Sequence, residues 1–277
     1  MITDDTPKVL TAKNDRMFKS IAHGNNGKDI LESILSTVFE EEVEILEFIP
    51  VELPLDTEDE RKKTLDVLVR VGEKIINIEI NAQGFSDITK IRNLAFICKL
   101  FSKHVSKGQE IDVKTKFLQI NFIFDSKKSK RLVTKSYLTN EDGIYTENLG
   151  IWNIFVENVE ELCYTNPEEM EKFRYILMLD KTPEELKNFF PNDNIIQKFR
   201  GEVVRLNSDA AFIREISEED EKMIISKQEG SAEKTIDVIK NLLIKHMSIE
   251  DIADVVNLSI DEVKNIIKEN NLDKTGE

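Results

Sequence analysis

The sequence predicts an α/β fold, in which helices flank a mixed sheet and an all-helical C-terminal region follows. Two short runs in the first half alternate apolar and polar residues, the period of a half-buried strand. Segments with helical spacing surround these runs, and from residue 150 onward helical patterns and helix caps dominate. We therefore expect an α/β domain over 1–150, a helical region over 151–229 and a small helix-turn-helix-like module over 230–277.

Two short helices and a strand open the predicted fold. Apolar residues at helical spacing predict helices over 15–22 and 29–39, and the HGNNG segment between them breaks the helical pattern. The run 43–53 predicts a strand, which Pro54 ends.

A β-hairpin follows, and the sequence predicts the register in which its two strands pair. Apolar and polar residues alternate over 65–71 and again over 76–83. Gly72 and Glu73 between these runs suit a two-residue turn, because glycine tolerates positive φ. In that register residue 71 faces residue 74, so Asp66 faces Glu79. A three-residue turn would break the alternation of faces.

The remaining elements are mostly helical. The segment 86–105 has neither Gly nor Pro, and its apolar residues at 91, 94, 95, 97, 98, 101 and 105 predict a core helix. FLQINFIF at 117–124 predicts a largely buried strand. Cap signals at 166–169 and 182–185, and capping boxes at 248–251 and 259–262, predict later helix starts. The last two helices are separated by a three-residue turn, which is helix-turn-helix spacing.

Composition excludes several classes of protein. The 277 residues carry 38 basic and 53 acidic side chains, a net charge of −15, but residues 1–140 hold 22 of each sign. The acidic excess therefore lies in 141–277, and the first half stays compatible with a nucleic-acid partner. The chain shows no signal-peptide pattern, no apolar run approaching the ~18 residues of a membrane span and no glycine-rich phosphate loop. We expect a cytoplasmic protein with no membrane contact and no nucleotide cofactor.

The two cysteines, Cys98 and Cys163, have no CxxC partner and lie in apolar surroundings. They predict buried thiols rather than zinc ligands or a disulfide.

The hairpin acids Asp66 and Glu79 are the strongest candidates for chemistry. Two carboxylates about 5 Å apart repel by roughly 3 kcal/mol at an effective dielectric constant of ~20. A divalent cation relieves this repulsion, and Mg²⁺ is commonly held by one or two carboxylates. The alternative is an exposed hairpin face on which both acids are solvated.

Several motifs occur in a recognisable order along the chain. They are NDRMFK at 14–19, LDVLV at 65–69, INIEINAQ at 76–83, RNLAFICKLFS at 92–102, KGQEI at 107–111 and MSIEDIADVVNLSIDEVKNI at 247–266. In order and spacing they resemble the recombination-promoting nuclease (Rpn) or PD-(D/E)XK nuclease family transposase proteins. The resemblance covers the region up to about residue 125 well, the middle helices loosely, and the tail. It implies a restriction-endonuclease-like α/β core.

The resemblance also implies a Mg²⁺-dependent DNA endonuclease. In that role Asp66 and Glu79 hold the metal, which activates a water and stabilises charge on the phosphate. Asp15, in the opening motif, is the leading candidate for an additional acid, ahead of Glu32. The alternative role for Asp15 is a helix N-cap.

Basic residues around the hairpin predict DNA contacts of low sequence specificity. Residues 101–140 hold nine cations against three acids, and cations contact phosphates without reading bases. The candidate DNA-binding residues are Lys19, Arg92, Lys99, Lys127, Lys128, Lys130 and Arg131. The alternatives are a solvated rim around a buried strand and, for Arg92 and Lys99, surface ion pairs.

One position departs from the family pattern. The third motif position is usually Lys in the PD-(D/E)XK superfamily and often Gln in this family, and here it is Asn81. Asparagine can hydrogen-bond a water but carries no charge. Gln83 follows on the same strand face. The sequence thus leaves open a second hypothesis, a nuclease-like scaffold without cleavage activity that binds DNA or protein. A glycosidase built on the same acids is disfavoured by the scarcity of aromatic residues, one Trp and four Tyr.

The C-terminal module predicts association rather than base reading. Its second helix, 259–269, carries three acids against two lysines, whereas groove-reading helices direct Arg, Lys, Asn or Gln at DNA. Formation of a homodimer and docking within the same chain both remain open.

Overall fold

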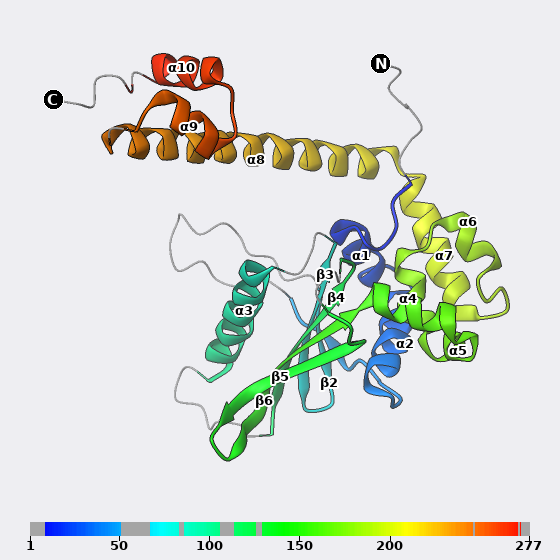
Figure 1. Cartoon of the computed structure of the whole chain (residues 1–277). Coiled ribbons are helices and arrows are strands. Elements are labelled where there is room, and N and C mark those ends of the chain that lie inside the picture. The colour runs from blue at the N-terminus through cyan, green and yellow to red at the C-terminus, as the bar shows by residue number, and fades with distance from the viewer. Residues whose placement is uncertain are drawn as a thin grey trace. The chain divides into compact units, whose positions relative to one another are not determined.

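The computed structural model of the protein describes residues 9–50, 67–82, 86–105, 114–125, 129–245, 247–270 and 272, without the side chains of 103–105 and 219–233. The chain divides into two compact units, Met1–Asp209 and Ala210–Glu277. The first unit contains the sheet (Figure 1).

A mixed six-stranded sheet forms the centre of the first unit, in the order β1-β2-β3-β4-β6-β5. β3, β4 and β6 run parallel, and the other neighbouring pairs are antiparallel. This confirms the predicted mixed sheet. The strands are β1 Glu47–Phe48, β2 Val67–Val71, β3 Lys74–Asn81, β4 Lys116–Ile123, β5 Val133–Asn140 and β6 Gly143–Phe155.

The hairpin of β2 and β3 has the predicted two-residue turn. Val71 pairs with Lys74 and Val67 with Ile78, and Gly72 adopts a φ of 52°. This φ lies in the left-handed region that glycine enters without steric cost. The same register continued by one residue would pair Asp66 with Glu79. Asp66 lies outside the described residues, so that pairing stays a prediction.

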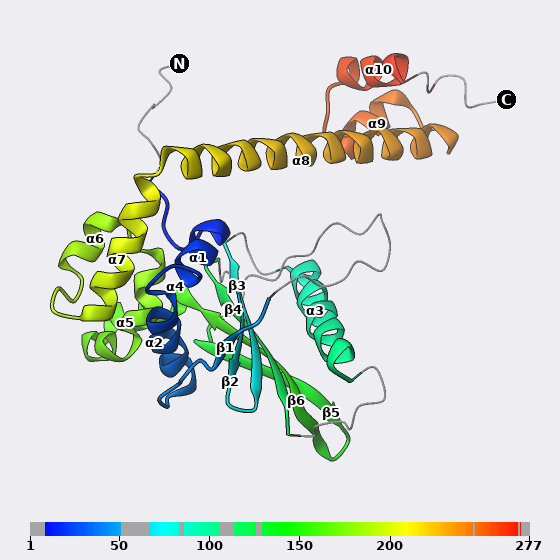
Figure 2. The ribbon, with the colours of Figure 1, turned by 180° about the vertical axis from the view of Figure 1, so that it is seen from behind.

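Helices cover both faces of the sheet, as Figures 1 and 2 show from opposite sides: α3 stands on one face and α2 on the other. α1 lies near the carboxyl end of β3 in both views. The helices of the first unit are α1 Asp15–Ala22, α2 Gly27–Phe39, α3 Asp87–Val105, α4 Val156–Thr165, α5 Met170–Leu177, α6 Pro183–Asn188 and α7 Asn194–Asn207. Short 3₁₀ turns precede and follow α5, at Pro167–Glu169 and Met178–Asp180.

The sheet face away from α3 is apolar and forms the main core. Ile76 and Ile78 on β3 are completely buried, and Ile80 is 6% exposed. Their neighbours Ile120 and Phe122 on β4 are also completely buried. This face confirms the apolar half of the predicted alternation.

α3 turns a different side to the sheet from the one that its sequence predicted. Phe96, Ile97 and Leu100 pack with the sheet residues Leu68, Ile75 and Phe117 in one buried cluster. Part of the predicted apolar stripe faces outward instead, with Ile91 69% and Leu94 53% exposed, whereas Ile97 of the same stripe is buried. The prediction failed because the sheet face beneath α3 is partly polar, and the helix directs Arg92 and Asn93 toward it.

The same rotation of α3 exposes Cys98, so the prediction that this thiol is buried was wrong. Cys163, on α4, is buried as predicted.

Two strand predictions also needed correction. Within the predicted strand 43–53, the described residues up to 50 contain only β1, Glu47–Phe48. The hairpin of β5 and β6 was missed, and β6 extends to Phe155 rather than giving way to helix at residue 150. Most of β5 is exposed at the sheet edge, so it lacks the burial pattern that identifies strands in a sequence. The apolar end of β6 is a continuous buried run, which periodicity does not distinguish from helix.

The second unit consists of a long helix, α8 Ala210–Ile244, and two short helices, α9 Ile249–Val256 and α10 Ile260–Glu269. α8 runs without interruption through residue 230. Ser248 and Ser259 cap α9 and α10 as predicted, and Asn257 between them adopts a left-handed conformation. A small core centred on Ile239, Ile252 and Val263 holds the three helices together. In the described part of the chain, every helix is too short or too polar to cross a lipid bilayer.

Candidate functional site

The candidate site lies on the polar face of β3, on the side of the sheet that carries α3. Asn77, Glu79 and Asn81 alternate there with the isoleucines of the core face. They are 1%, 8% and 6% exposed, respectively. The alternative of a solvated hairpin face is therefore wrong for Glu79, which is buried.

Glu79 is held by partners on two different elements. Arg92 of α3 donates from Nη2 to Glu79 Oε1 at 2.7 Å. Gln119 of β4 donates from Nε2 to Glu79 Oε2 at 2.9 Å. Each carboxylate oxygen has two lone pairs, so both oxygens keep accepting capacity for a further ligand. The carboxylate is thereby oriented without being saturated.

The protonation of Glu79 reflects burial and nearby charges. Burial raises the pKa of its carboxyl above the ordinary value of 4.5, because desolvation disfavours the charged form. The Arg92 guanidinium lowers this pKa, and the Asp15 carboxylate of α1 raises it. The hydrogen bond from Gln119 and the charge of Lys19 lower it by smaller amounts. Carboxyl groups with a raised pKa are concentrated at functional sites, so the raised pKa of Glu79 makes it a candidate functional residue.

A chain of side-chain hydrogen bonds crosses the sheet at this level. Asn77 Nδ2 donates to Gln119 Oε1 at 2.8 Å, and Gln119 Nε2 donates to Asn121 Oδ1 at 2.9 Å. Asn121 Nδ2 donates to Asn153 Oδ1 at 2.8 Å, and Asn153 Nδ2 donates to Thr134 Oγ1 at 3.1 Å. Four strands, β3, β4, β6 and β5, are linked by polar side chains in a buried layer.

Asn93 connects α3 to this layer. Its Nδ2 donates to Asn121 Oδ1 at 3.0 Å. With the amide turned over, the nitrogen donates instead to Glu79 Oε2 and to the Thr89 carbonyl oxygen, each at 3.2 Å. Either orientation ties the helix to the polar face, because asparagine offers both a donor and an acceptor.

The site residues Gln119, Asn121 and Asn153 were not predicted from the sequence. A signal was present, since polar residues alternate within the apolar runs FLQINFIF and IWNIF. Gln119 and Asn121 are completely buried. Burying a polar group costs free energy unless the group is hydrogen-bonded. Polar residues that alternate within buried strands therefore indicate a hydrogen-bonded polar layer.

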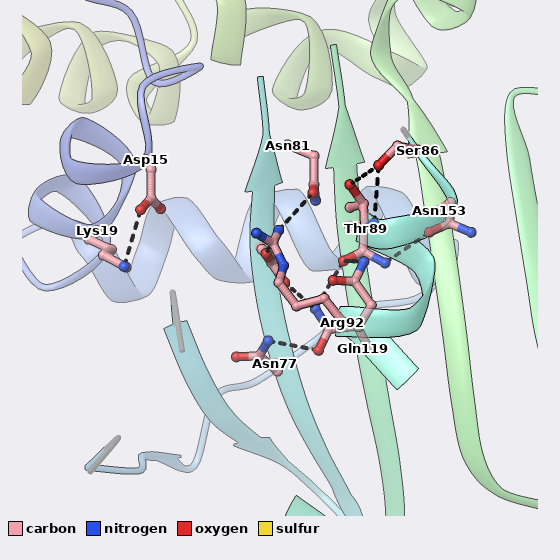
Figure 3. Close-up of polar contacts among 12 residues, drawn as sticks. Asp15, Lys19, Asn77, Asn81, Ser86, Thr89, Arg92, Gln119 and Asn153 are labelled. Carbon is pink, nitrogen blue, oxygen red and sulfur yellow. Dashed lines mark hydrogen bonds and ion pairs between the residues drawn. The ribbon is translucent and has the colours of Figure 1, made fainter. Parts of the chain in front are cut away.

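Asp15 lies in the first turn of α1 but does not cap the helix. The cap is Asn14, whose side chain accepts from the Met17 backbone amide, so the N-cap alternative for Asp15 is wrong. Asp15 Oδ2 lies 3.3 Å from Lys19 Nζ, and the two side chains are 50% and 24% exposed (Figure 3). Both charges influence the pKa of Glu79, which puts the opening motif within electrostatic reach of the site.

Asn81 is buried and incompletely paired. Its Oδ1 lies 3.5 Å from Arg92 Nη2, at the limit of a hydrogen bond. Its Nδ2 is buried and has no hydrogen-bond partner among the described residues. Buried donors are normally hydrogen-bonded, so the Asn81 amide is an exception within this polar face.

The other predicted residues have different positions. Asp66, Gln83, Lys127 and Lys128 lie outside the described residues. Lys99 lies on α3, two turns beyond Arg92. Lys130 and Arg131 are exposed just before β5, at the sheet edge where the parallel strands end.

Glu32 has a structural role rather than a place at the site. Its Oε1 accepts from the Ile45 backbone amide at 2.8 Å, which ties α2 to the chain before β1.

The donor atoms at the site suit a hard divalent cation. Glu79 offers a buried carboxylate and Asn81 an amide oxygen, and oxygen is the ligand that Mg²⁺ prefers. The described residues contain no group of three or more His, Cys, Asp or Glu placed to bind a metal. Asp66, the predicted partner of Glu79, lies outside the described residues.

Comparison with known families identifies the chain. A family model described as PD-(D/E)XK nuclease family transposase matches residues 12–234, which include β3, α3 and the polar layer. No curated protein and no solved structure matches the chain. Nucleases of the PD-(D/E)XK group typically use divalent cations. The match covers most of the chain, so the protein belongs to the PD-(D/E)XK nuclease family transposase family.

Proposed function

We propose that this protein is a cytoplasmic, Mg²⁺-dependent DNA endonuclease of low sequence specificity. The observation that carries the proposal is the Glu79 carboxylate, which is buried, oriented by Arg92 and Gln119, and still able to accept a ligand. The carboxylate lies beside the Arg92 guanidinium. Metal-dependent phosphodiester hydrolysis uses this combination, a carboxylate that binds the metal and a positive charge close to it.

The reaction is the hydrolysis of one phosphodiester bond. The oxygen of a water forms a bond to phosphorus while one phosphorus–oxygen ester bond breaks. One proton of the water passes to the leaving oxygen, which gives a hydroxyl on one strand end and a phosphomonoester on the other. Glu79 and Asp66 would hold the metal, which activates the water and stabilises charge on the phosphate.

The other residues of the site bind and orient. Gln119 fixes the Glu79 carboxylate through the 2.9 Å hydrogen bond to Oε2. Lys130 and Arg131 lie just before β5, at the end of the sheet where the parallel strands finish. They would contact the DNA backbone without reading bases. Lys19, beside Asp15, would add positive charge at the opening motif.

Plasmid nicking tests the proposal. Supercoiled DNA is incubated with the wild type in Mg²⁺ or in EDTA, and with the Glu79→Gln and Asp66→Asn variants. We expect nicking only with Mg²⁺, and a loss of about 100-fold or more in each variant. Glu202→Gln is the matched control, because Glu202 is equally buried but bonds Asn26 and Arg205 instead. Wild-type nicking that is no faster than that of Glu79→Gln would refute the proposal.

A second function, DNA or protein binding without cleavage, is favoured by one observation. Asn81 supplies no charge at the position where the superfamily usually has Lys, and its side chain is one methylene shorter than the Gln that is frequent in this family. This alternative predicts that the wild type shifts the fluorescence anisotropy of labelled DNA, or binds a protein partner, yet nicks no plasmid in Mg²⁺.

A further inference from the structure

The uncharged Asn81 raises the question of which group supplies positive charge at the site. Figure 3 shows the Arg92 side chain reaching from α3 toward Asn81. The Arg92 Nη2 atom lies 2.7 Å from Glu79 Oε1 and 3.5 Å from Asn81 Oδ1. A guanidinium thus lies against both the buried carboxylate and the amide.

Arg92 also has donors to spare. An arginine guanidinium carries five N–H donors in a planar fork. Among the described residues, only Nη2 of Arg92 makes a hydrogen bond, and the side chain is 49% exposed. Nε and Nη1 therefore remain available to an anion that approaches from solvent, and a planar fork matches the geometry of phosphate oxygens.

The orientation of α3 agrees with such a role. The helix leaves Ile88 80% and Ile91 69% exposed while it directs Arg92 and Asn93 to the polar layer. Burying the apolar stripe would be favourable, at about 25 cal/mol per Å². Local choices that conflict with simple burial are concentrated at functional sites.

We propose that Arg92 is a catalytic residue of this protein, which supplies from α3 the positive charge that Asn81 lacks. The proposal rests on the proposed endonuclease function. The guanidinium donates to a non-bridging oxygen of the scissile phosphate and stabilises the negative charge that develops there as the water oxygen bonds to phosphorus. Arginine stays protonated, so Arg92 does not accept the proton of the water. Glu79 and Asn81 keep the guanidinium in place.

A charge-relocation experiment tests this role. The rate at saturating DNA and the KM for DNA are measured for the wild type, Arg92→Met, Arg92→Lys and Arg92→Met combined with Asn81→Lys. We expect Arg92→Met to lower kcat by about 10²–10³-fold, the loss typical of one transition-state donor, with a KM within about threefold of the wild type. Arg92→Lys should retain at least about tenfold more activity than Arg92→Met. Asn81→Lys, which puts the charge back on β3, should restore kcat in the double variant by about tenfold or more.

Controls separate this proposal from its competitors. Lys90→Ala removes a cation from the same helix, where Lys90 pairs with Asp87 at 2.8 Å, and should leave kcat unchanged. Far-ultraviolet circular dichroism checks that each variant is folded. A raised KM with unchanged kcat would make Arg92 a DNA-backbone contact and overturn the proposal. Loss of kcat that neither lysine rescues would make Arg92 a structural partner of Glu79 and overturn it equally.

The same nicking rates distinguish a failure of the endonuclease proposal from a failure of the Arg92 proposal alone. If the wild type nicks DNA no faster than Glu79→Gln, both proposals fall. If the wild type nicks faster than Glu79→Gln but Arg92→Met keeps the wild-type rate, only the role of Arg92 falls.

Discussion

The two faces of the central sheet use the same strands for different purposes. On the core face, Ile78 of β3 and Phe122 of β4 are completely buried among apolar neighbours. On the other face, Ile75 and Phe117 pack under α3. Closer to the carboxyl ends of the strands this face is polar, and Gln119 there bonds Glu79. Burial of apolar surface is non-directional, whereas a buried polar group needs a partner at a defined distance and angle. The core face therefore determines stability, and the polar face determines the geometry of the site.

The largest expected effect comes from the core face. Phe122→Ala removes a completely buried ring, so we expect the free energy of unfolding to fall by about 3–5 kcal/mol. Urea denaturation measures this loss, with Leu138→Ala on the exposed part of β5 as the control. The nicking rate per folded molecule should stay unchanged. A large loss in that rate would mean that the two faces do not have separate roles.

A smaller effect is expected in the polar layer. Gln119→Leu leaves the Asn77 donor buried and unpaired, which should cost about 1–3 kcal/mol of unfolding free energy. Adding Asn77→Leu removes the orphaned donor, so the double variant should be more stable than the sum of the two single losses predicts. Additive losses in a double-mutant cycle would contradict the view that this layer depends on paired contacts.

The pH dependence of stability probes Glu79 directly. Without metal, the folded state holds the proton on Glu79 to a higher pH than the unfolded state, because burial raises its pKa above 4.5. Stability relative to Glu79→Gln should therefore be fully present below pH 4.5 and decline as the pH rises through the folded pKa. Urea denaturation of both proteins in EDTA from pH 4 to about pH 8 measures this. A constant difference between the two proteins would show that burial does not perturb Glu79.

The smallest effect tests the orientation of α3. Ile91→Lys changes an exposed residue, so the free energy of unfolding should move by no more than about 0.5 kcal/mol. Leu100→Lys, on the side that packs on the sheet and outside the predicted stripe, should destabilise by several times as much, because Leu100 is 9% exposed. The opposite order would mean that the helix buries the stripe that its sequence predicts.

Sequence reasoning succeeded where a local pattern had one structural solution. The turn at Gly72 and the alternation around it defined the register of β2 and β3, since a slip of one residue would reverse every side chain. The caps at Thr182, Ser248 and Ser259 were equally local, because a cap bonds the backbone three residues later. Both kinds of feature depend on neighbours along the chain.

Sequence-based predictions failed where the surroundings of a helix or strand are formed by residues distant in the chain. The apolar stripe of α3 predicts which side should be buried only if the surface beneath is apolar, and that surface is partly polar. The β5 strand exists because β6 offers an edge to pair with, and its own exposed residues carry little signal.

The candidate site shows the same division. Glu79 and Asn81 were identified from the sequence because motif spacing places them on one strand face. Gln119 and Arg92 lie 40 and 13 residues from Glu79 along the chain. Arg92 was expected to contact DNA or to form a surface ion pair, and its actual partner, the buried Glu79, was not predicted from the sequence.

The sequence by itself determined the class of fold, the register of the hairpin and the candidate carboxylates, because periodicity and turn chemistry act over a few residues. Only the tertiary structure decided that the polar face is buried, that four strands share one hydrogen-bonded layer and that Arg92 meets Glu79. Those features depend on the parallel pairing of β3, β4 and β6 and on the rotation of α3. Both depend on contacts between residues far apart in the chain, where the partner of a polar group is chosen by geometry rather than by sequence pattern.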